Sequence, residues 1–296
     1  MSETIYLERL EQRYIVYLKL VAKSRIHVGS TQEGTLKRMV WMNVNGKLLP
    51  AIPAESFKGA LRKLAAKIAK SIDFQNPEIK EIVAYHTQDR HSRKEKDKLI
   101  YPEFIKNANI EDTLKKIFNE EQLKELSYDA RNELYLSLKC PVCRLFGSRG
   151  LAGKMLLEDV LLIDEPKTNI YTSTSIDRKN KTVASERLFS IESLEPNLRF
   201  KCRIIIDNVE RESPEAILLA RMFEYLLKMG EINIGGAKSR GYGRLAIDKD
   251  SIVHLQIFKT PIDEGEILEN INILLGKKIE TKSLNEFIEW LVYAKS

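Results

Sequence analysis

The chain contains little cysteine, with three residues of this type among 296: Cys140, Cys143 and Cys202. So small and odd a number excludes a disulfide framework and favours a reducing compartment. Long apolar runs are also missing, since no stretch approaches the ~20 residues of a membrane-spanning helix. The opening residues, MSETIYLERLEQRY, are charged throughout, unlike a signal peptide. These absences predict a cytoplasmic protein without a membrane partner.

A strong excess of charge of either sign is missing too. Lys and Arg number 48 against 42 Asp and Glu, which gives a formal net charge of +6. This mild basicity favours an anionic partner but does not by itself indicate a nucleic acid. The length allows one large decorated domain or two ordinary ones. Because no clear linker divides the chain, we expect a single domain over residues 1–296.

The periodicity of apolar residues predicts the elements of a core. They are a strand at 14–23, a hairpin at 39–53 around Asn45-Gly46, a helix at 56–72 capped by Ser56, strands at 154–163 and 199–207, a helix at 213–230 and a strand at 244–248. Without the hairpin, this order is βαββαβ. We therefore expect an α+β fold with a ferredoxin-like (RRM-like) core. Many unrelated proteins share this plan, so the fold alone does not give the function.

The remaining segments are predicted to be additions to this core. Residues 73–139 have a charged, helical pattern and form a helical insertion, with a loop at 88–98 that we expect to be mobile. Residues 165–190 are polar and predict an exposed arm or β-hairpin. The C-terminal extension, 249–296, is expected to hold a strand at 252–258 and helices near 265–275 and 283–294.

Glycine is concentrated in one stretch, NIGGAKSRGYGRL at 233–245, which holds four of the 14 glycines. Backbone N–H groups in such turns can converge on an anion, and the absence of Cβ atoms lets a phosphate approach. Lys238, Arg240 and Arg244 add positive charge, and Tyr242 could stack a base. The alternative is a tight helix-to-strand connection with a solvated basic face. The density of these signals favours binding.

Two further stretches could contact an anion. In IPAESFKGALRK, Lys58 and Arg62 share a face near the start of a helix, where N–H groups are unpaired. An ordinary helix with lysines in water explains this stretch at least as well. In SRIHVGSTQEG, His27 could be a general base, a phosphate contact or a structural residue, with Ser30 beside it. No neighbouring Cys or Asp supports nucleophilic catalysis, so the last two roles are favoured.

The stretch CPVCRLFGSRGLAGK suggests the one cofactor that this sequence offers. Cys140 and Cys143 have the spacing of zinc ligands, but a closed tetrahedral site needs two more. His86 and His91, five positions apart in the sequence, could complete a Cys2His2 set. The alternative is a pair of buried thiols before a turn. The same stretch forms a second basic glycine-rich loop, with Gly147, Gly150, Gly153, Arg144, Arg149 and Lys154.

Four of these stretches occur together in one order: HVGS, IPAESFKGALR, CPVCRLFGS and GGAKSRGYGRL. In combination they resemble the RAMP superfamily and, more narrowly, the backbone subunit of type III CRISPR effector complexes, over roughly residues 14–248. The resemblance implies a ferredoxin-like core with inserted lid and thumb elements. Such subunits associate with one another and with other subunits along a guide RNA, which pairs with target RNA. Their thumb displaces a base of the guide at regular intervals.

The resemblance also implies a set of RNA-binding residues. They are His27, Ser30, Lys37, Arg38, Lys58, Arg62, Arg178, Gly235, Gly236, Lys238, Ser239, Arg240, Gly241 and Arg244. The arm at 165–190, which includes Asp177 and Arg178, is similar to the thumb. The partners implied are guide RNA, target RNA and the other subunits of an effector complex.

One departure from the family concerns catalysis. RNA-cleaving members carry an Asp in the loop after the first strand, which acts with a divalent metal. Residues 29–45 contain no Asp, the aligned position falls near Lys37 or Arg38, and Glu33 is the only carboxylate. Without a carboxylate a catalytic metal loses its ligand, so we expect no catalytic residue and no cleavage.

Two alternatives stay open at this point. The chain could be an endoribonuclease of the same superfamily, either cutting target RNA with a metal or processing guide precursors with His27. It could also be an isolated ferredoxin-like protein whose basic loops bind a small anionic ligand.

Overall fold

The computed structural model of the chain describes residues 10–87, 90–95, 98–176, 183–258 and 264–293. Its central sheet contains β1 (Gln12–Ala22), β9 (Val160–Leu162), β12 (Arg199–Asp207) and β14 (Arg244–Ile247). These strands lie in the order β14-β1-β12-β9, and each neighbouring pair is antiparallel. Helix α1 (Ala54–Ala69) comes between β1 and β9, and α7 (Pro214–Lys228) between β12 and β14. The predicted α+β, ferredoxin-like core is therefore confirmed.

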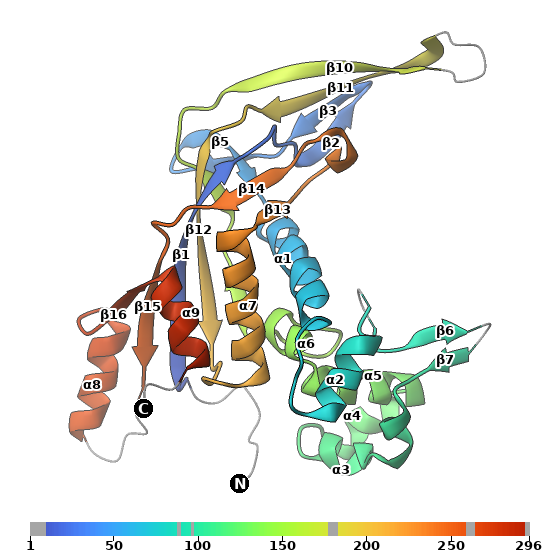
Figure 1. Ribbon diagram of the computed structural model, residues 1–296, viewed down its shortest axis with the longest axis vertical. Helices are drawn as coiled ribbons and strands as arrows, with labels where there is room; N and C mark the ends of the chain where they lie inside the picture. The colour runs from blue at the N-terminus through green and yellow to red at the C-terminus, as the bar shows by residue number, and fades with distance from the viewer. Residues whose placement is uncertain (1–9, 88–89, 96–97, 177–182, 259–263, 294–296) are drawn as a thin grey trace.

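Alternation along β1 creates the core beneath these helices. Every second residue of the strand is buried, and helices α1 and α7 pack side by side against the sheet (Figure 1). The largest fully buried side chains of this core include Tyr14, Leu18 and Leu20 from β1, Phe57 and Leu61 from α1, Phe200 from β12 and Phe223 from α7. Burying one such side chain contributes about 1.5–3 kcal/mol, so this layer fixes the scaffold on which the loops are mounted.

The segment predicted as one strand at 154–163 is two strands, β8 (Met155–Leu157) and β9. The break between them positions Asp159, whose Oδ1 accepts the N–H of Ala54 at 2.8 Å. Helix α1 therefore begins at Ala54 with Pro53 as its N-cap residue, and the prediction that Ser56 caps it is wrong. The sequence could not reveal this partner because it lies 105 positions away.

The hairpin predicted around Asn45-Gly46 is confirmed as β4 (Trp41–Val44) and β5 (Lys47–Ile52). Asn45 and Gly46 have φ angles of 51° and 83°, the pair of left-handed conformations that a type I′ turn requires. β5 pairs with β9, so this hairpin extends the central sheet.

The stretch after β1, expected to be a loop, forms a second hairpin of β2 (Gly29–Glu33) and β3 (Leu36–Met39). The sequence of this hairpin shows little alternation of apolar residues, because the hairpin is stabilised by strands far away in the sequence. β3 pairs with β11 (Val183–Leu194), which pairs with β10 (Thr168–Ile176). These strands form a second sheet in the order β10-β11-β3-β2. The β10–β11 hairpin extends from the top of the molecule as the predicted arm (Figure 1).

The insertion at 73–139 is mostly helical, as predicted, and lies below α1 in Figure 1. With the helix that follows it, it contains α2 (Pro77–Tyr85), β6 (Arg93–Glu95), β7 (Lys98–Ile100), η1 (Glu103–Asn107), α3 (Ile110–Lys115), α4 (Glu120–Glu125), α5 (Tyr128–Lys139) and α6 (Pro141–Phe146). Within the stretch 88–98, predicted to be a mobile loop, residues 93–95 form β6, which pairs with β7, while residues 88–89 and 96–97 lie outside the described part of the structure. The stretch also contains His91, which is buried.

The C-terminal extension adds β15 (Ile252–Ile257), α8 (Glu264–Leu274), β16 (Glu280–Ser283) and α9 (Leu284–Val292), so both predicted helices are confirmed. β15 pairs with the start of β1, and α9 packs on α7. The ring of Phe287 in α9 meets that of Tyr14 edge to face, with centroids 5.2 Å apart. Throughout the described part of the chain, helices are too short or too polar to cross a membrane.

Candidate nucleic-acid interface and metal centre

The glycine-rich loop at 233–245 packs directly on the backbone that follows β1. A Cβ atom at Gly235 would lie 2.0 Å from the carbonyl oxygen of His27, and one at Gly243 would lie 2.0 Å from that of Ile234. Both glycines have left-handed φ angles, 71° and 86°. No other residue fits these two positions. Close packing, the alternative weighed for this stretch, therefore explains two of its four glycines.

Several N–H groups of the loop are already used inside the chain. Gly236 donates to the carbonyl of His27 at 3.0 Å, and Gly243 donates to that of Arg25 at 2.7 Å. Gly241 donates to Lys238 within a short 3₁₀ turn. These groups cannot form the anion-binding nest that the glycines suggested.

The positive charge of the loop lies in its side chains. Lys238, Ser239 and Arg240 are exposed at its tip. Arg244 is exposed too, but its guanidinium lies 3.4 Å from the carboxylate of Glu231, which offsets part of its charge. The tip of the loop therefore carries positive charge on Lys238 and Arg240.

His27 lies beneath this loop rather than on its surface. It is 4% exposed, and its Nδ1 donates a hydrogen bond to the carbonyl oxygen of Glu192 in β11 at 2.7 Å. The carboxylate of Glu192 in turn accepts the N–H of Met39 in β3 at 2.9 Å. His27 thus joins the glycine-rich loop to the second sheet, and its burial leaves no ring face for the expected direct contact with RNA.

Tyr242 is also buried, at 8% exposed, so the idea that its ring stacks a base is wrong. Its hydroxyl accepts a hydrogen bond from Nη1 of Arg25 at 3.2 Å. The guanidinium of Arg25 also lies 3.8 Å from the ring centroid of Tyr171, at the base of the β10–β11 arm. Cation–π contact of this kind contributes about 0.5–1 kcal/mol at exposed sites. Arg25 therefore connects the arm to the glycine-rich loop.

The basic residues of α1 fall into two groups, one bonded within the protein and one exposed to solvent, and the sequence alone could not distinguish them. Lys58 is half-buried, and its Nζ donates to the carbonyl of Met155 in β8 at 2.9 Å. Burial, with Arg62 nearby, lowers the pKa of Lys58. Its expected contact with a phosphate is thus replaced by one with the protein's own backbone. Lys63 and Lys67, one turn apart, are exposed instead.

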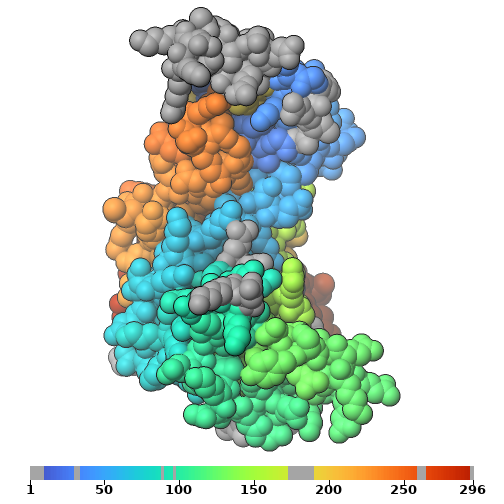
Figure 2. Space-filling model, turned by 90° about the vertical axis from the view of Figure 1, so that its right-hand side faces the viewer, coloured from blue at the N-terminus to red at the C-terminus, as the bar shows by residue number. Residues whose placement is uncertain are grey.

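These lysines continue the charge of the glycine-rich loop. Burial, and then the charge of nearby Lys63, lowers the pKa of Lys238. We call Lys63, Lys67, Lys238 and Arg240 the basic surface. Helix α1 contacts β13 (Glu231–Asn233), which leads into the loop, and Figure 2 shows segments 50–70 and 230–245 side by side on one face.

Gly59 lies on the same exposed side of α1, four residues before Lys63. A Cβ atom there would meet no atom within 4 Å, and its φ angle is not left-handed. Nothing in the fold therefore requires a glycine, although glycine in a helix interior costs about 1 kcal/mol relative to alanine. The feature suits the close approach of another molecule to the helix backbone. Glu55, one turn earlier, is the acidic residue of this face.

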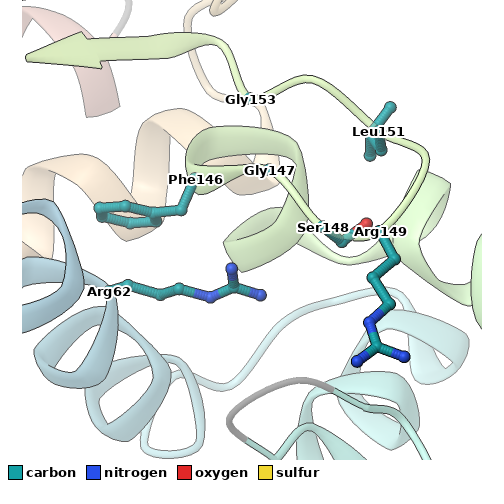
Figure 3. A pocket seen from close by; sticks show the side chains of 7 residues that line it. All are labelled: Arg62, Phe146, Gly147, Ser148, Arg149, Leu151 and Gly153. Atoms are coloured by element: carbon teal, nitrogen blue, oxygen red, sulfur yellow. The ribbon is translucent and has the colours of Figure 1, made fainter. Parts of the chain in front are cut away.

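Arg62 lies beside a pocket of about 380 Å³ formed by the second glycine-rich loop. The pocket is lined by Arg62, Phe146, Gly147, Ser148, Arg149, Leu151 and Gly153. In Figure 3 the guanidinium of Arg62 extends from α1 under the turn of Gly147 and Ser148. Arg62 Nε and Ser148 Oγ are buried there without a hydrogen-bond partner in the protein. Two guanidinium groups and a hydroxyl give this pocket the chemistry to hold an anion.

Three other predicted RNA-binding residues belong to strands of the second sheet. Lys37 and Arg38 belong to β3, where Lys37 is opposite Ile191 of β11. Ser30 belongs to β2, but its side chain is outside the described part of the structure, as is that of Glu33. Asp177 and Arg178 also lie outside the described residues.

The four candidate metal ligands meet at the junction of the insertion and α6, although the closest members of the two pairs, His91 and Cys140, are 49 positions apart in the sequence. His86, His91, Cys140 and Cys143 are each at most 2% exposed, and their ligand atoms lie within 4.8 Å of one another. His86 Nδ1 is 3.1 Å from His91 Nε2 and 3.5 Å from Cys140 Sγ, and Cys143 Sγ is 3.6 Å from His91 Nε2. Tetrahedral zinc with bonds of about 2.0–2.3 Å separates its ligand atoms by about 3.3–3.8 Å. The set therefore fits zinc.

The surroundings of the set also suit a metal. Nδ1 of His91 lies 3.2 Å from the carboxylate of Glu133, which orients the ring so that Nε2 faces the other ligands. Hydrogen bonds with Cys140 first, and then with the two histidines, lower the pKa of Cys143, whereas burial raises that of Cys140. Metals bind the thiolate form, so the environment of Cys143 favours ligation.

The fold and this site define a ferredoxin-like protein with a helical insertion, an extended arm and a buried Cys2His2 set. The sequence matches the RAMP superfamily over residues 19–246, which is most of the chain. The chain belongs to the RAMP superfamily. Among solved structures, a chain of a "Type IV-B CRISPR Complex" is similar at 17% identity and a TM-score of 0.45, over 80% of this chain and 89% of that chain. No curated protein matches.

Proposed function

We propose that this chain is a guide-RNA-binding backbone subunit of a CRISPR effector complex, of type III by its motifs, which holds RNA without cleaving it. The observation that carries the proposal is the basic surface, where α1 and the glycine-rich loop present Lys63, Lys67, Lys238 and Arg240 on one face. Such a surface neutralises successive phosphates of a strand. The superfamily and the order of the four motifs support RNA as the anion.

Because lysines contact phosphates rather than bases, we expect the affinity for RNA to depend little on base sequence. Flexible lysines reach phosphates, whereas base recognition needs aromatic rings or fixed hydrogen-bonding groups at the base edges. Tyr242, the aromatic residue of the loop, is buried against Arg25. We therefore infer that affinity comes from charge and that the Arg62 pocket adds one further phosphate position.

Two features support the proposal that the chain does not cleave RNA. The stretch 29–45 contains no Asp, and Lys37 and Arg38 near the aligned position would repel Mg2+. His27, the candidate general base of the processing alternative, is buried with its Nδ1 bonded to Glu192. The burial of His27 gives the processing alternative no support.

We further propose that zinc binds His86, His91, Cys140 and Cys143 and has a structural role. All four ligands come from protein, so a tetrahedral ion has no open position for substrate. The ion would join the end of α2 and the β6–β7 hairpin to α6, which packs on α1 and α7. It would thereby fix the insertion relative to the basic surface.

The proposal is tested by measuring what the purified chain carries and how it binds. We expect RNA to co-purify, and binding of unrelated single strands to be similar and to weaken steeply as salt rises. Strong preference for one sequence, or a flat salt dependence, would contradict phosphate binding. A nucleotide that competes as well as RNA would support the small-ligand alternative.

A paired set of variants locates the surface. Lys63→Ala with Lys67→Ala should weaken RNA binding roughly tenfold at low salt and reduce the salt slope by about two. Lys115→Ala with Lys116→Ala, which removes the same charge from exposed positions of the insertion, is the matched control. Equal losses in both variants would mean that only net charge matters.

A further inference from the structure

Arg62 contacts both the pocket of the second glycine-rich loop and the Cys2His2 set. Its Nη2 donates a hydrogen bond to Sγ of Cys143 at 3.8 Å, while its Nε is buried without a hydrogen-bond partner in the described part of the chain. A guanidinium carries five N–H donors, so one arginine can serve two acceptors at once. This contact therefore places a single cation between the pocket and a candidate metal ligand.

Helix α6 makes a second connection between the two sites. It contains Cys143, and its end leads directly into the pocket, where the N–H of Gly147 donates to the carbonyl of Cys143 at 2.7 Å. A Cβ atom at Gly153 would lie 2.4 Å from the nitrogen of Gly147, so the two ends of the loop are in contact. Ser148 and Leu151 exchange backbone hydrogen bonds of 2.9 and 3.2 Å. Because the loop is closed on itself, a shift of Cys143 also shifts the wall of the pocket.

The donors around the pocket fit one tetrahedral oxyanion. Arg62 and Arg149 supply guanidinium groups, and Ser148 supplies a hydroxyl whose oxygen is buried. In Figure 3 both arginine side chains extend below the turn at Gly147 and Ser148. Guanidinium groups bind phosphate through paired N–H donors, which match the oxygen atoms of a phosphate or sulfate group. Among the described residues that line the pocket, none is acidic.

Zinc in the Cys2His2 set would change the charge beside Arg62. A free thiolate attracts the guanidinium as an opposite charge, whereas two thiolates bound to one Zn2+ have no net charge. Metal binding therefore leaves the charge of Arg62 to an anion in the pocket. It also fixes α6, and with it the loop that forms the wall of the pocket. Both effects favour the anion.

We propose that Arg62 couples the pocket to the metal set, so that zinc in the set and a tetrahedral oxyanion in the pocket each strengthen the binding of the other. This inference rests on the proposed function, in which zinc binds the set and the pocket takes a phosphate. Such coupling is reciprocal, so the same factor applies to both ligands. An RNA phosphate in the pocket would in this way tighten the junction between the insertion and α1.

The zinc affinity of the full chain tests the coupling, measured by competition with a chelator after nuclease treatment. Sulfate is the probe, because it is a tetrahedral dianion that binds free zinc weakly, and chloride at the same ionic strength is the reference. We expect saturating sulfate to raise zinc affinity about fivefold or more. Equal affinity in the two salts would overturn the coupling. A purified chain that holds no zinc would instead contradict the proposed function itself.

Three variants test the role of Arg62. Arg62→Lys keeps the positive charge and all four ligands but replaces the planar fork of donors by one ammonium, so the effect of sulfate on zinc affinity should largely disappear. Arg149→Gln should reduce the effect as well. Arg221→Gln, which removes an exposed arginine of α7 outside the pocket, is the matched control and should leave the effect unchanged. A full sulfate effect in Arg62→Lys would contradict this role.

Single-stranded RNA in place of sulfate identifies the source of the oxyanion. If an RNA phosphate fills the pocket, RNA should raise the zinc affinity of the parent chain but not that of Arg62→Lys. An effect of sulfate without one of RNA would assign the pocket to a free anion. Lys63→Ala with Lys67→Ala should weaken RNA binding and keep the effect of sulfate, because it leaves the pocket intact. Failure of the basic surface and failure of the coupling are thus distinguished.

Discussion

At the residue scale, neighbouring side chains of the same type have different roles in this protein. Lys58 and Lys63 are five positions apart on α1, yet Lys58 is bonded to the carbonyl of Met155 while Lys63 faces solvent. The same holds for the cysteines, because Cys140 and Cys143 meet two histidines while Cys202 packs near the carbonyl of Glu158. Burial and partner, rather than residue type, decide which groups can bind a ligand.

The metal site gives the first prediction. We expect about one zinc per purified chain by elemental analysis, and Cys143→Ser should lose it and lower the melting temperature by roughly 5–10 °C. Glu133→Gln should keep the four ligands but weaken zinc affinity about 10–100-fold, because it alters the carboxylate that orients His91.

Cys202→Ser is the matched control for zinc content, since it changes a buried thiol outside the set. Zinc should stay near one per chain in this variant. Negligible zinc in the unmodified chain would leave the buried thiols as a packing feature only.

Lys154 gives the second prediction, which concerns pH. Burial, and then the charge of Arg144, lowers its pKa from 10.5 to about 8, while its Nζ donates to the carbonyl of Asn208. Between pH 8 and 10.5 the unfolded chain therefore binds more protons at this site than the folded chain. The contribution of Lys154 to stability rises with pH across that window, by about 1–3 kcal/mol.

Urea unfolding of the parent and of Lys154→Met at pH 7.5, 9 and 10.5 measures this effect. The difference in unfolding free energy should shift in favour of the parent as pH rises, since all other groups cancel. A difference that stays constant would mean that the ammonium is solvated, and one that moves the other way would mean that the fold raises its pKa.

At the element scale, helix α1 has one face that packs in the core and one face that is open to solvent. Its buried face carries Phe57 and Leu61 into the core, and its open face carries Gly59, Lys63 and Lys67. The inward face is explained by packing, but Gly59 is not, because its surroundings have room for a side chain. The helix thus gives up stability at a position that the fold itself does not constrain.

Gly59→Ala is the third prediction. It should raise the unfolding free energy by about 0.5–1 kcal/mol, because alanine has the higher helix propensity and fits the backbone. It should also weaken RNA binding several-fold if RNA approaches the helix at this point. Thermal melts and gel shifts on the same preparation separate the two effects.

Gly230→Ala is the contrasting variant, since its Cβ atom would lie 2.3 Å from the Cα atom of Leu226. This change should lower stability and leave the RNA affinity of the folded fraction unaltered. A Gly59→Ala chain that is more stable and binds RNA as well as the parent would remove the close-approach interpretation.

At the scale of the whole molecule, a rigid ferredoxin-like sheet and a second sheet are joined through His27 and Arg25. His27 bonds to Glu192 of β11, and Arg25 bonds to Tyr242 while its guanidinium covers Tyr171 of β10. The arm and the glycine-rich loop therefore share supports. The insertion is attached separately, through α6 and the Cys2His2 set.

The fourth prediction concerns RNA held by this assembly. Labelled RNA incubated with the chain and Mg2+ should stay intact, because the stretch 29–45 has no Asp to ligate the metal. Lys37→Ala with Arg38→Ala should weaken binding without changing any cleavage pattern. Glu33→Gln should alter neither, and loss of a Mg2+-dependent cut in this variant would establish the endonuclease alternative.

The sequence by itself determined the order of the core elements and the Asn45-Gly46 turn, and it offered two candidate pairs of metal ligands, His86 with His91 and Cys140 with Cys143. These depend on local periodicity, on turn chemistry and on residue types that have few other uses when paired, so they can be read within short windows. The superfamily, too, was recognisable from four short motifs, and the match over residues 19–246 confirms it.

Only the tertiary structure decided which basic groups face solvent and which glycines are structural. Asp159 caps α1 from 105 positions away, and Glu192 holds His27 from 165 positions away. Two N–H groups of the glycine-rich loop, those of Gly236 and Gly243, likewise donate to the carbonyls of His27 and Arg25. Contacts over such separations depend on how the sheets pack, and no local pattern encodes which hydrogen-bonding groups that packing leaves for a ligand.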